Sequence, residues 1–126
     1  MIFGGLGGRL DHTIANLHVL DYLVERGARG CLAGDHENVL LIKGSSGIAF
    51  HESAAGELSV FAYGGKAEGV YLSGLKYPLE DALLTTDFPI GVSNVFMGMK
   101  SDISVRNGKL LIMWTGTLDW LMYDAI

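Results

Sequence analysis

Apolar residues recur at helical spacing in the first part of the chain. The repeat comprises Leu10, Ile14, Leu17, Leu20 and Val24. Because these positions share one side of a 3.6-residue repeat, they predict an amphipathic helix over about residues 11–26. Asp11 stands where an N-cap residue is expected, and Gly27 stands where a helix commonly ends in the left-handed conformation.

Short β-type runs replace this pattern from residue 39 onward. The runs are residues 39–42, 48–50, 58–63, 69–72, 92–96, 103–105 and 110–114. Glycine-containing turn signals such as Gly64-Gly65 separate them. Several short strands at this spacing predict an antiparallel β-sandwich. Residues 28–33 predict one further short buried strand, and residues 1–3 have the character of a strand end.

Three connecting segments carry more specific expectations. Asn107-Gly108 between two apolar runs predicts a β-hairpin with a type I′ turn. Residues 79–85 predict a short helical turn that crosses the sandwich. The apolar tail, residues 115–126, predicts a short helix and offers a surface for a partner chain. The whole pattern predicts an α+β chain that is mostly β, with one helix and one or two strands before an antiparallel β-sandwich.

A glycine-rich segment precedes the predicted helix. Four of the five residues 4–8 are glycine, and Arg9, Asp11 and His12 follow closely. Free N–H groups at a helix N-terminus and an arginine side chain both suit a phosphate group. The common dinucleotide motif, however, requires glycine where Leu10 stands, and no Walker-type lysine motif is present. A tight strand-to-helix turn without a ligand accounts for the same residues equally well.

Composition restricts the class of protein. The chain has 126 residues, 49% of them hydrophobic and 18% charged, so it is expected to fold as one ordinary globular unit. A net charge of −5 at pH 7 argues against nucleic acid as a main partner. The single cysteine, Cys31, lies in an apolar run and is expected in the core. No signal peptide and no apolar stretch of about 18 residues is visible, so a cytoplasmic protein without membrane contact is expected.

Three blocks of residues carry a resemblance to a known family. Residues 7–16 read GGRLDHTIAN, which resembles the G-G-R-x-D-H-x-x-x-N motif of thiamine pyrophosphokinases. Residues 74–79 read GLKYPL and residues 91–94 read GVSN, and both resemble further motifs of that family. The blocks stand in the family's order with similar spacing, so the resemblance extends from Gly4 to about Trp114.

The resemblance implies a function and a division of the chain. The family transfers pyrophosphate from ATP to thiamine, which yields thiamine diphosphate and AMP. Residues 1–36 would be the remnant of an α/β nucleotide-binding catalytic domain, and residues 37–126 a thiamine-binding β-sandwich. The family's preceding α/β segment is missing here, so the chain is expected to be a fragment that is inactive alone. The alternative is a stand-alone β-sandwich module that binds a ligand or a partner without catalysis.

The resemblance also implies catalytic residues. Gly7 and Gly8 would form a phosphate-binding loop, and Arg9 would hold phosphate oxygens. Asp11 would bind Mg²⁺, the expected cofactor beside ATP, or would orient the attacking hydroxyl of thiamine. His12 would take part in catalysis or would only hydrogen-bond to the backbone.

Three further residues would contact thiamine. Ser93 and Asn94 can offer donors and acceptors to an aminopyrimidine ring, although a β-turn with side-chain-to-backbone bonds explains the same pair. Tyr77 would stack on a flat heterocycle, or would serve equally as a core or interface aromatic. A homodimer is expected because the family forms homodimers and because this small chain is unusually apolar, with a mean hydropathy of +0.32.

Overall fold

The structure, a computed structural model, describes residues 2–3, 10–88 and 90–122. Its elements are β1 (Ile2–Phe3), α1 (Leu10–Glu25), β2 (Cys31–Ala33), β3 (Glu37–Lys43), β4 (Ser46–Phe50), β5 (Glu57–Ala62), β6 (Ala67–Ser73), β7 (Leu79–Leu84), β8 (Asn94–Val95), β9 (Ser101–Val105), β10 (Lys109–Thr115), the 3₁₀ helix η1 (Leu118–Trp120) and β11 (Leu121–Met122). Neither helix of the described residues is long and apolar enough to cross a membrane.

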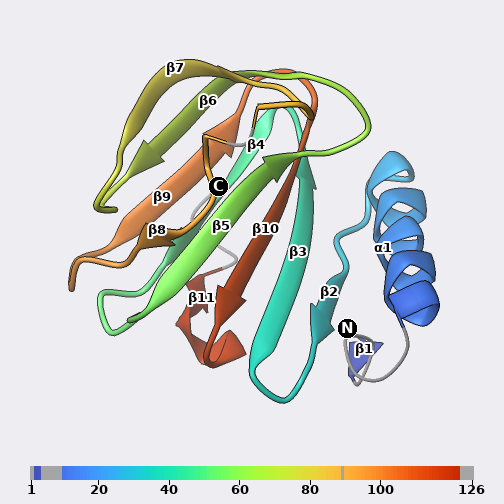
Figure 1. The fold of residues 1–126 in the computed structure, drawn as a ribbon, viewed down its shortest axis with the longest axis horizontal. Coiled ribbons are helices and arrows are strands. Elements are labelled where there is room, and N and C mark those ends of the chain that lie inside the picture. Colours follow the sequence, from blue (N-terminus) through green and yellow to red (C-terminus); the bar gives the residue numbers. More distant parts are fainter. Residues whose placement is uncertain (1, 4–9, 89, 123–126) are drawn as a thin grey trace.

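The described strands form two sheets that face each other (Figure 1). Sheet A has the order β1-β2-β3-β10-β5-β8, and sheet B has the order β11-β4-β9-β6-β7. Neighbouring strands are antiparallel except β1 and β2, which are parallel. The expected α+β class with an antiparallel β-sandwich is therefore confirmed.

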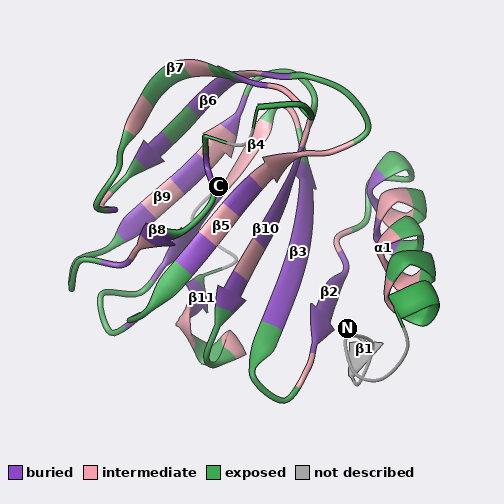
Figure 2. Ribbon diagram, viewed as in Figure 1, coloured by how far each residue is buried: buried purple, intermediate pink, exposed green. Residues whose placement is uncertain are grey.

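The main core lies between the two sheets, because side chains alternate between the faces of each strand. In β9, for example, every second residue is buried, beginning with Ser101. The Phe50 ring packs edge-on against Phe96 at a centroid distance of 5.2 Å and against Trp114 at 4.9 Å. Figure 2 shows this buried layer running through the central strands of both sheets.

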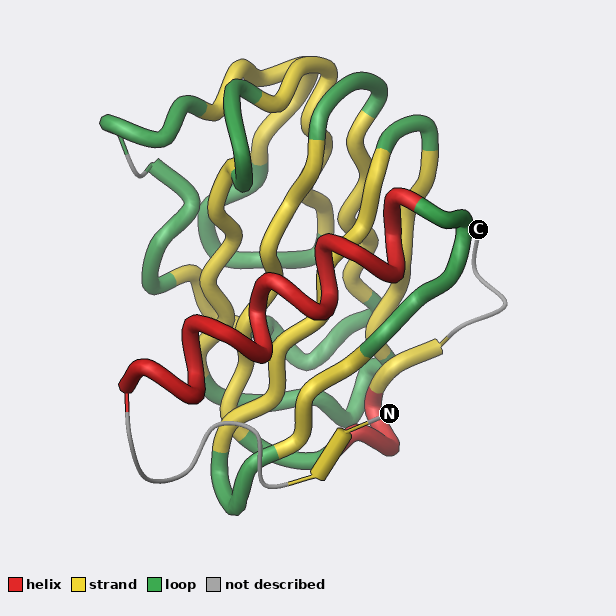
Figure 3. Tube along the Cα trace, turned by 90° about the vertical axis from the view of Figure 1, so that its right-hand side faces the viewer, coloured by secondary structure: helices red, strands yellow, loops and turns green. Residues whose placement is uncertain are grey.

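Helix α1 covers part of the outer face of sheet A, where it forms a second apolar cluster. Leu20 and Val24 pack there with Val39, Leu41 and Leu111. β3 is consequently covered on both faces, which explains why its apolar residues form a continuous run rather than an alternating one. Figure 3 shows the helix lying obliquely across the strands of this face.

The predicted helix is confirmed, but its two ends differ from expectation. Asp11 lies in the first turn of α1 rather than at the N-cap, so that prediction is wrong. Gly27 follows the helix with a φ of 78°, as predicted for the residue after a helix end. Leu10 and Ile14 are 73% and 45% exposed, so the predicted apolar face is buried only toward its C-terminal end.

Charged residues join the end of α1 to sheet A. The Lys109 ammonium lies 2.6 Å from an oxygen of Asp21 and 3.0 Å from one of Glu25, and Lys43 lies 2.8 Å from Glu25. The hydrogen bond to Asp21 raises the pKa of Lys109, whereas the hydrogen bonds from Lys43 and Lys109 lower the pKa of Glu25. These contacts hold the C-terminal half of the helix over β3 and β10.

The hairpin expected at Asn107-Gly108 is wrong. β9 belongs to sheet B and β10 to sheet A, so this turn carries the chain from one sheet to the other. Gly108 has a φ of 95°, but Asn107 is not among the described residues with positive φ, and a type I′ turn requires positive φ at both positions. The local sequence identified the turn but not the partners of its strands.

The short helical turn expected at residues 79–85 is also wrong, because this segment forms strand β7. β7 pairs with β6 through Leu79, Ala82 and Leu84, and the register shifts between the pairs. Asp81 has a φ of 46°, which interrupts the regular alternation. Apolar residues spaced three and then two apart imitate a helical pattern, and only the pairing with β6 reveals the strand.

The described part of the tail packs on its own sandwich. η1 and β11 follow β10, and β11 pairs with β4. Leu121 is buried, and the Trp120 carbonyl accepts the N–H of His51 at 2.7 Å. The short helix expected in the tail is thus present as a single 3₁₀ turn. Residues 116–122 therefore contact the sandwich of their own chain.

Cys31 is a core residue, as expected. It is 3% exposed in β2, and burial raises the pKa of its thiol to about 11. The strand that contains it is shorter than predicted, as is β8, while the other predicted strands recur at nearly their expected positions. Pairing with β3 supplies the partner that this short strand requires.

Candidate functional site

Two of the three sequence blocks lie side by side in the structure. The block at residues 74–79 connects β6 to β7, and the block at residues 91–94 leads into β8. The Lys76 N–H donates to the Val95 carbonyl at 3.0 Å. β7 and β8 are each the last strand of their sheet, so the two blocks meet at one edge of the sandwich (Figure 1).

Asn94 joins the two blocks through its side-chain amide. Its Oδ1 accepts the N–H groups of Tyr77 at 2.9 Å and Val95 at 3.0 Å, and its Nδ2 donates to the Tyr77 carbonyl at 2.8 Å. Asn94 is 2% exposed, whereas the Tyr77 side chain stands 55% exposed. Asn94 therefore fixes the position of Tyr77, and the tyrosine ring is the group of this pair that faces solvent.

The backbone of the second block is tightly constrained. The Gly91 carbonyl accepts the Val60 N–H at 2.9 Å, and a Cβ at Gly91 would lie 2.4 Å from the Val60 carbonyl oxygen. Only glycine fits at that position. Ser93 has a φ of 60°, and its N–H donates to the Ser59 hydroxyl at 3.0 Å. Non-glycine residues in this conformation cluster at binding sites, where the surrounding structure holds them.

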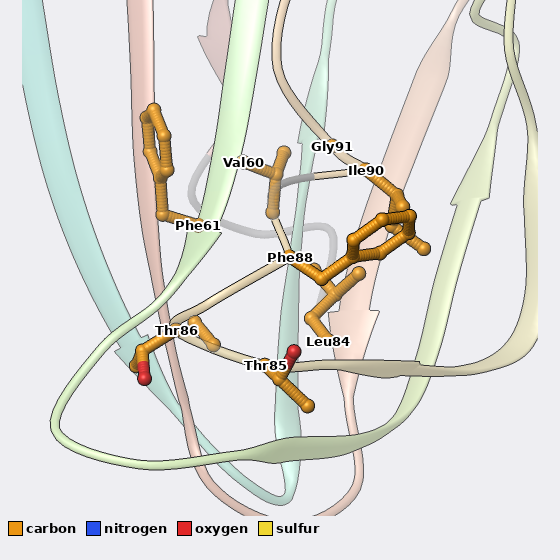
Figure 4. A pocket seen from close by; sticks show the side chains of 9 residues that line it. Val60, Phe61, Leu84, Thr85, Thr86, Phe88, Ile90 and Gly91 are labelled. Carbon is orange, nitrogen blue, oxygen red and sulfur yellow. The ribbon is translucent and has the colours of Figure 1, made fainter.

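A small cavity of 30 Å³ lies beside this second block, between β5 and the segment that follows β7. Figure 4 shows the side chains of Val60, Leu84, Phe88 and Ile90 gathered around it, while Phe61 points away from them. Ligand pockets usually measure about 300–1,000 Å³, so this cavity is too small for a heterocyclic ligand.

A larger hollow of 270 Å³ lies on the outer face of sheet A, and we call it the outer groove. Its lining includes Glu37, Glu57, Ser59, Phe61, Met113 and Thr115. Ser59 also accepts the N–H of Ser93, so the second block borders this groove. The sequence did not predict the groove residues. The alternation of apolar and polar residues along β5 can be recognised in the sequence. The extent to which α1 covers the outer face of sheet A cannot.

The expected catalytic residues lie elsewhere. Asp11 and His12 are exposed in the first turn of α1, where an oxygen of Asp11 accepts the His12 N–H at 2.9 Å. Gly7, Gly8 and Arg9 lie outside the described residues. α1 packs over β3, whereas the blocks around Tyr77 and Asn94 lie at the β8 end of sheet A. Three strand spacings of about 4.8 Å separate β3 from β8, so about 14 Å of sheet lies between the two groups.

The segment that contains both blocks matches a known family. The family model described as "Thiamin pyrophosphokinase, vitamin B1 binding domain" matches residues 48–110, a segment that contains both adjoining blocks. The chain belongs to the thiamin pyrophosphokinase family. The expected family resemblance is thereby confirmed. No curated protein matches the chain.

Solved structures of family members have the same fold. Thiamine pyrophosphokinase from Bacillus subtilis matches with a TM-score of 0.83 at 22% identity, over 93% of this chain and 55% of that one. The enzyme from Geobacillus thermodenitrificans gives 0.77 at 19% identity, over 94% and 54%, and the yeast enzyme gives 0.73 at 21%, over 94% and 40%. The chain thus spans about half the length, or less, of these structures.

Proposed function

We propose that this chain is the thiamine-binding part of a thiamine pyrophosphokinase, which transfers pyrophosphate from ATP to thiamine and yields thiamine diphosphate and AMP. The observation that carries the proposal is the vitamin B1 binding domain at residues 48–110, whose two characteristic blocks meet through Asn94 and Tyr77. In this proposal residues 1–36 come from the catalytic domain and residues 37–126 from the thiamine-binding domain. Sheet A continues across that boundary, because β2 pairs with β3.

The start of α1 would serve the pyrophosphate. Gly7, Gly8 and Arg9 would hold phosphate oxygens near the N-terminus of the helix, and His12 would assist there. Asp11 fits Mg²⁺ as an exposed carboxylate, since this ion is commonly bound by one or two carboxylates together with substrate phosphates. Bound there, Mg²⁺ would neutralise charge that develops on the transferred group.

The opposite end of sheet A would serve thiamine. Tyr77 has an exposed ring that can stack on a heterocycle, and Asn94 holds that ring in place through the backbone. Ser93, held by Ser59 in its left-handed conformation, would offer its hydroxyl to the aminopyrimidine ring. Binding and transfer would then use different ends of the same sheet.

We expect this chain to bind thiamine but not to convert it. Titration calorimetry with thiamine should give saturable binding, and incubation with ATP, Mg²⁺ and thiamine should give no thiamine diphosphate by chromatography. Turnover at ordinary enzyme rates of about 1–10³ s⁻¹ would contradict the expected inactivity. If the chain binds no thiamine, the thiamine proposal fails. That result would favour the alternative, a stand-alone β-sandwich module that binds another ligand or a partner without catalysis.

We also expect the chain to form a homodimer through the edge of the sandwich. Large apolar side chains are exposed there, and exposed apolar patches often mark interaction surfaces. They are Leu83, Phe88, Ile90, Val92, Met97 and Met99. A second copy could bring the start of its α1 to the thiamine end of the first, which would join the two separated halves of the site.

Sedimentation at low micromolar concentration tests this expectation. The wild-type chain should sediment at twice its mass of 13.5 kDa. Phe88→Ser should shift the equilibrium to the monomer, because this side chain is 67% exposed within the apolar edge. Met122→Ser serves as the control, since Met122 is 37% exposed in β11 at the far end of sheet B. A wild-type monomer would defeat the proposal.

A further inference from the structure

Residues 116–122, which we call the closing segment, cross from one sheet to the other at one end of the sandwich. The segment leaves β10 of sheet A, forms η1, and continues as β11 beside β4 of sheet B (Figure 1). Leu118 and Trp120 of η1 are partly buried and pack against the main core. The segment therefore covers core side chains that lie between the two sheets.

Hydrogen bonds fix the closing segment at both ends. The Asn38 side chain, which is 2% exposed, donates to the Gly116 carbonyl at 2.9 Å, and the Gly116 N–H donates to the His36 carbonyl at 3.1 Å. At the other end the Trp120 carbonyl accepts the His51 N–H at 2.7 Å, directly before β11 pairs with β4. The backbone on either side of the Trp120 side chain is thus held in place.

The Trp120 ring has contacts that restrict its position. Gly116 has a φ of 127°, and a Cβ at this glycine would overlap the six-membered ring of the indole. Only glycine leaves room for the indole there. The indole also packs edge-on against Phe96, with a centroid distance of 6.1 Å and an interplanar angle of 69°. Displacing the indole would therefore remove a neighbour of Phe96.

Phe96 lies where the two sequence blocks meet. It directly follows β8, which contains Asn94, and its backbone forms a β-bridge with Leu75 of the first block. Phe96 is 6% exposed, and its ring also packs against Phe50. Because protein interiors are close-packed, a ring that loses a neighbour shifts together with the backbone that carries it. A shift of Phe96 would move Asn94 and Leu75, and with them both blocks.

We propose that Trp120 is a positioning residue for the thiamine site, which acts through Phe96 on Asn94 and Tyr77. This inference rests on the proposed function, since it assigns to the closing segment a role in binding the proposed ligand. Trp120 holds Phe96 from within the core, Phe96 fixes the end of β8, and the Asn94 amide then fixes Tyr77. A site that is held in its binding geometry before the ligand arrives loses less free energy to ordering when it binds.

Two variants remove or displace the indole, and a third retains an aromatic ring. Trp120→Ala removes the contact with Phe96, and Gly116→Ala keeps the indole but displaces it, so the second variant tests the same contact if the first does not fold. Since the effect on the site is limited by the strength of one aromatic contact, we expect both to bind thiamine about three- to tenfold more weakly. Trp120→Phe should stay within about twofold of the wild type, because a ring still meets Phe96.

Amide hydrogen exchange supplies a second readout that does not need a ligand. The N–H groups of Tyr77 and Val95 both donate to Asn94, so their exchange reports whether this residue is held in place. Their exchange is measured relative to the amides of β9, which corrects for global unfolding. We expect both N–H groups to exchange faster in Trp120→Ala and Gly116→Ala, and at the wild-type rate in Trp120→Phe.

Leu20→Ala is the control for a general loss of stability. Leu20 is 1% exposed in the second apolar cluster, between α1 and sheet A, and this cluster does not include Phe96. The variant should lower the melting temperature but leave thiamine affinity and the relative exchange of Tyr77 and Val95 unchanged. All affinities are measured by titration calorimetry at a temperature where circular dichroism shows each variant to be folded.

The outcomes distinguish this inference from the proposed function. If the wild type binds thiamine and folded Trp120→Ala or Gly116→Ala retains either the wild-type affinity or the wild-type relative exchange, Trp120 does not position the site and the proposed function stands. If Leu20→Ala weakens binding as much as Trp120→Ala, stability alone explains the effect and the inference is also wrong. If the wild type binds no thiamine, the proposed function fails and the role of Trp120 in binding fails with it.

Discussion

Replacing Phe50 by alanine is expected to destabilise the chain by about 3–5 kcal/mol, the range measured for truncating buried phenylalanines. The residue is 0% exposed at the centre of the sandwich, and its ring contacts those of Phe96 and Trp114. The surrounding strands belong to two sheets and cannot collapse into the resulting cavity without losing their pairing. Total stabilities of about 5–15 kcal/mol mean that this single change removes much of the folding free energy.

Urea unfolding followed by circular dichroism measures this effect. Phe88→Ala is the matched control, because the same side chain is removed from a site that is 67% exposed. That variant, measured under conditions where the chain is monomeric, should change the free energy of unfolding by less than about 0.5 kcal/mol. Equal losses for the two variants would mean that Phe50 does not lie in the core described above.

Replacing Asn94 by alanine is expected to cost about 3 kcal/mol, because each of the three hydrogen bonds made by its amide contributes about 1 kcal/mol. The N–H groups of Tyr77 and Val95 and the Tyr77 carbonyl would lose their partner. Thiamine affinity should fall together with stability if Tyr77 stacks on the ligand, because the tyrosine would no longer be held in place.

Two measurements separate these effects. Thermal unfolding reports the lost hydrogen bonds, and calorimetric titration with thiamine at a temperature where the variant is folded reports the displaced ring. Asn107→Ala is the control, since it removes the same side chain from an exposed turn. A folded Asn94→Ala chain with wild-type affinity would show that the position of Tyr77 does not matter for binding.

Local sequence was sufficient wherever a segment's own residues decide its conformation. The amphipathic repeat predicted α1, and Gly27 marked its end, because side-chain periodicity and the freedom of glycine act within one or two turns. The β-type runs became strands for the same reason. The prediction for residues 79–85 was wrong because register shifts between β6 and β7 disturb the alternation of apolar and polar residues by which a strand is recognised.

The candidate site divides in the same way. The sequence blocks at residues 74–79 and 91–94 identified the family, and the matched domain agrees. Their contact could not be read from the sequence, since Asn94 and Tyr77 are 17 residues apart and meet only when β6, β7 and β8 are in place. The sequence left two roles open for the amide of Asn94, contact with a ligand or bonds to the backbone, and in the fold the amide bonds to backbone groups.

The sequence by itself determined the class of fold, the positions of most elements and the family of the chain, because periodicity, turn chemistry and motif order are properties of neighbouring residues. The tertiary structure alone decided the sheet to which each strand belongs, the pairing of β11 with β4, and the open groove lined by Glu37, Glu57 and Phe61. These features depend on pairing between distant segments and on the area that α1 leaves uncovered. The hydrophobic pattern of a strand shows that one face is buried, but it does not identify what covers that face.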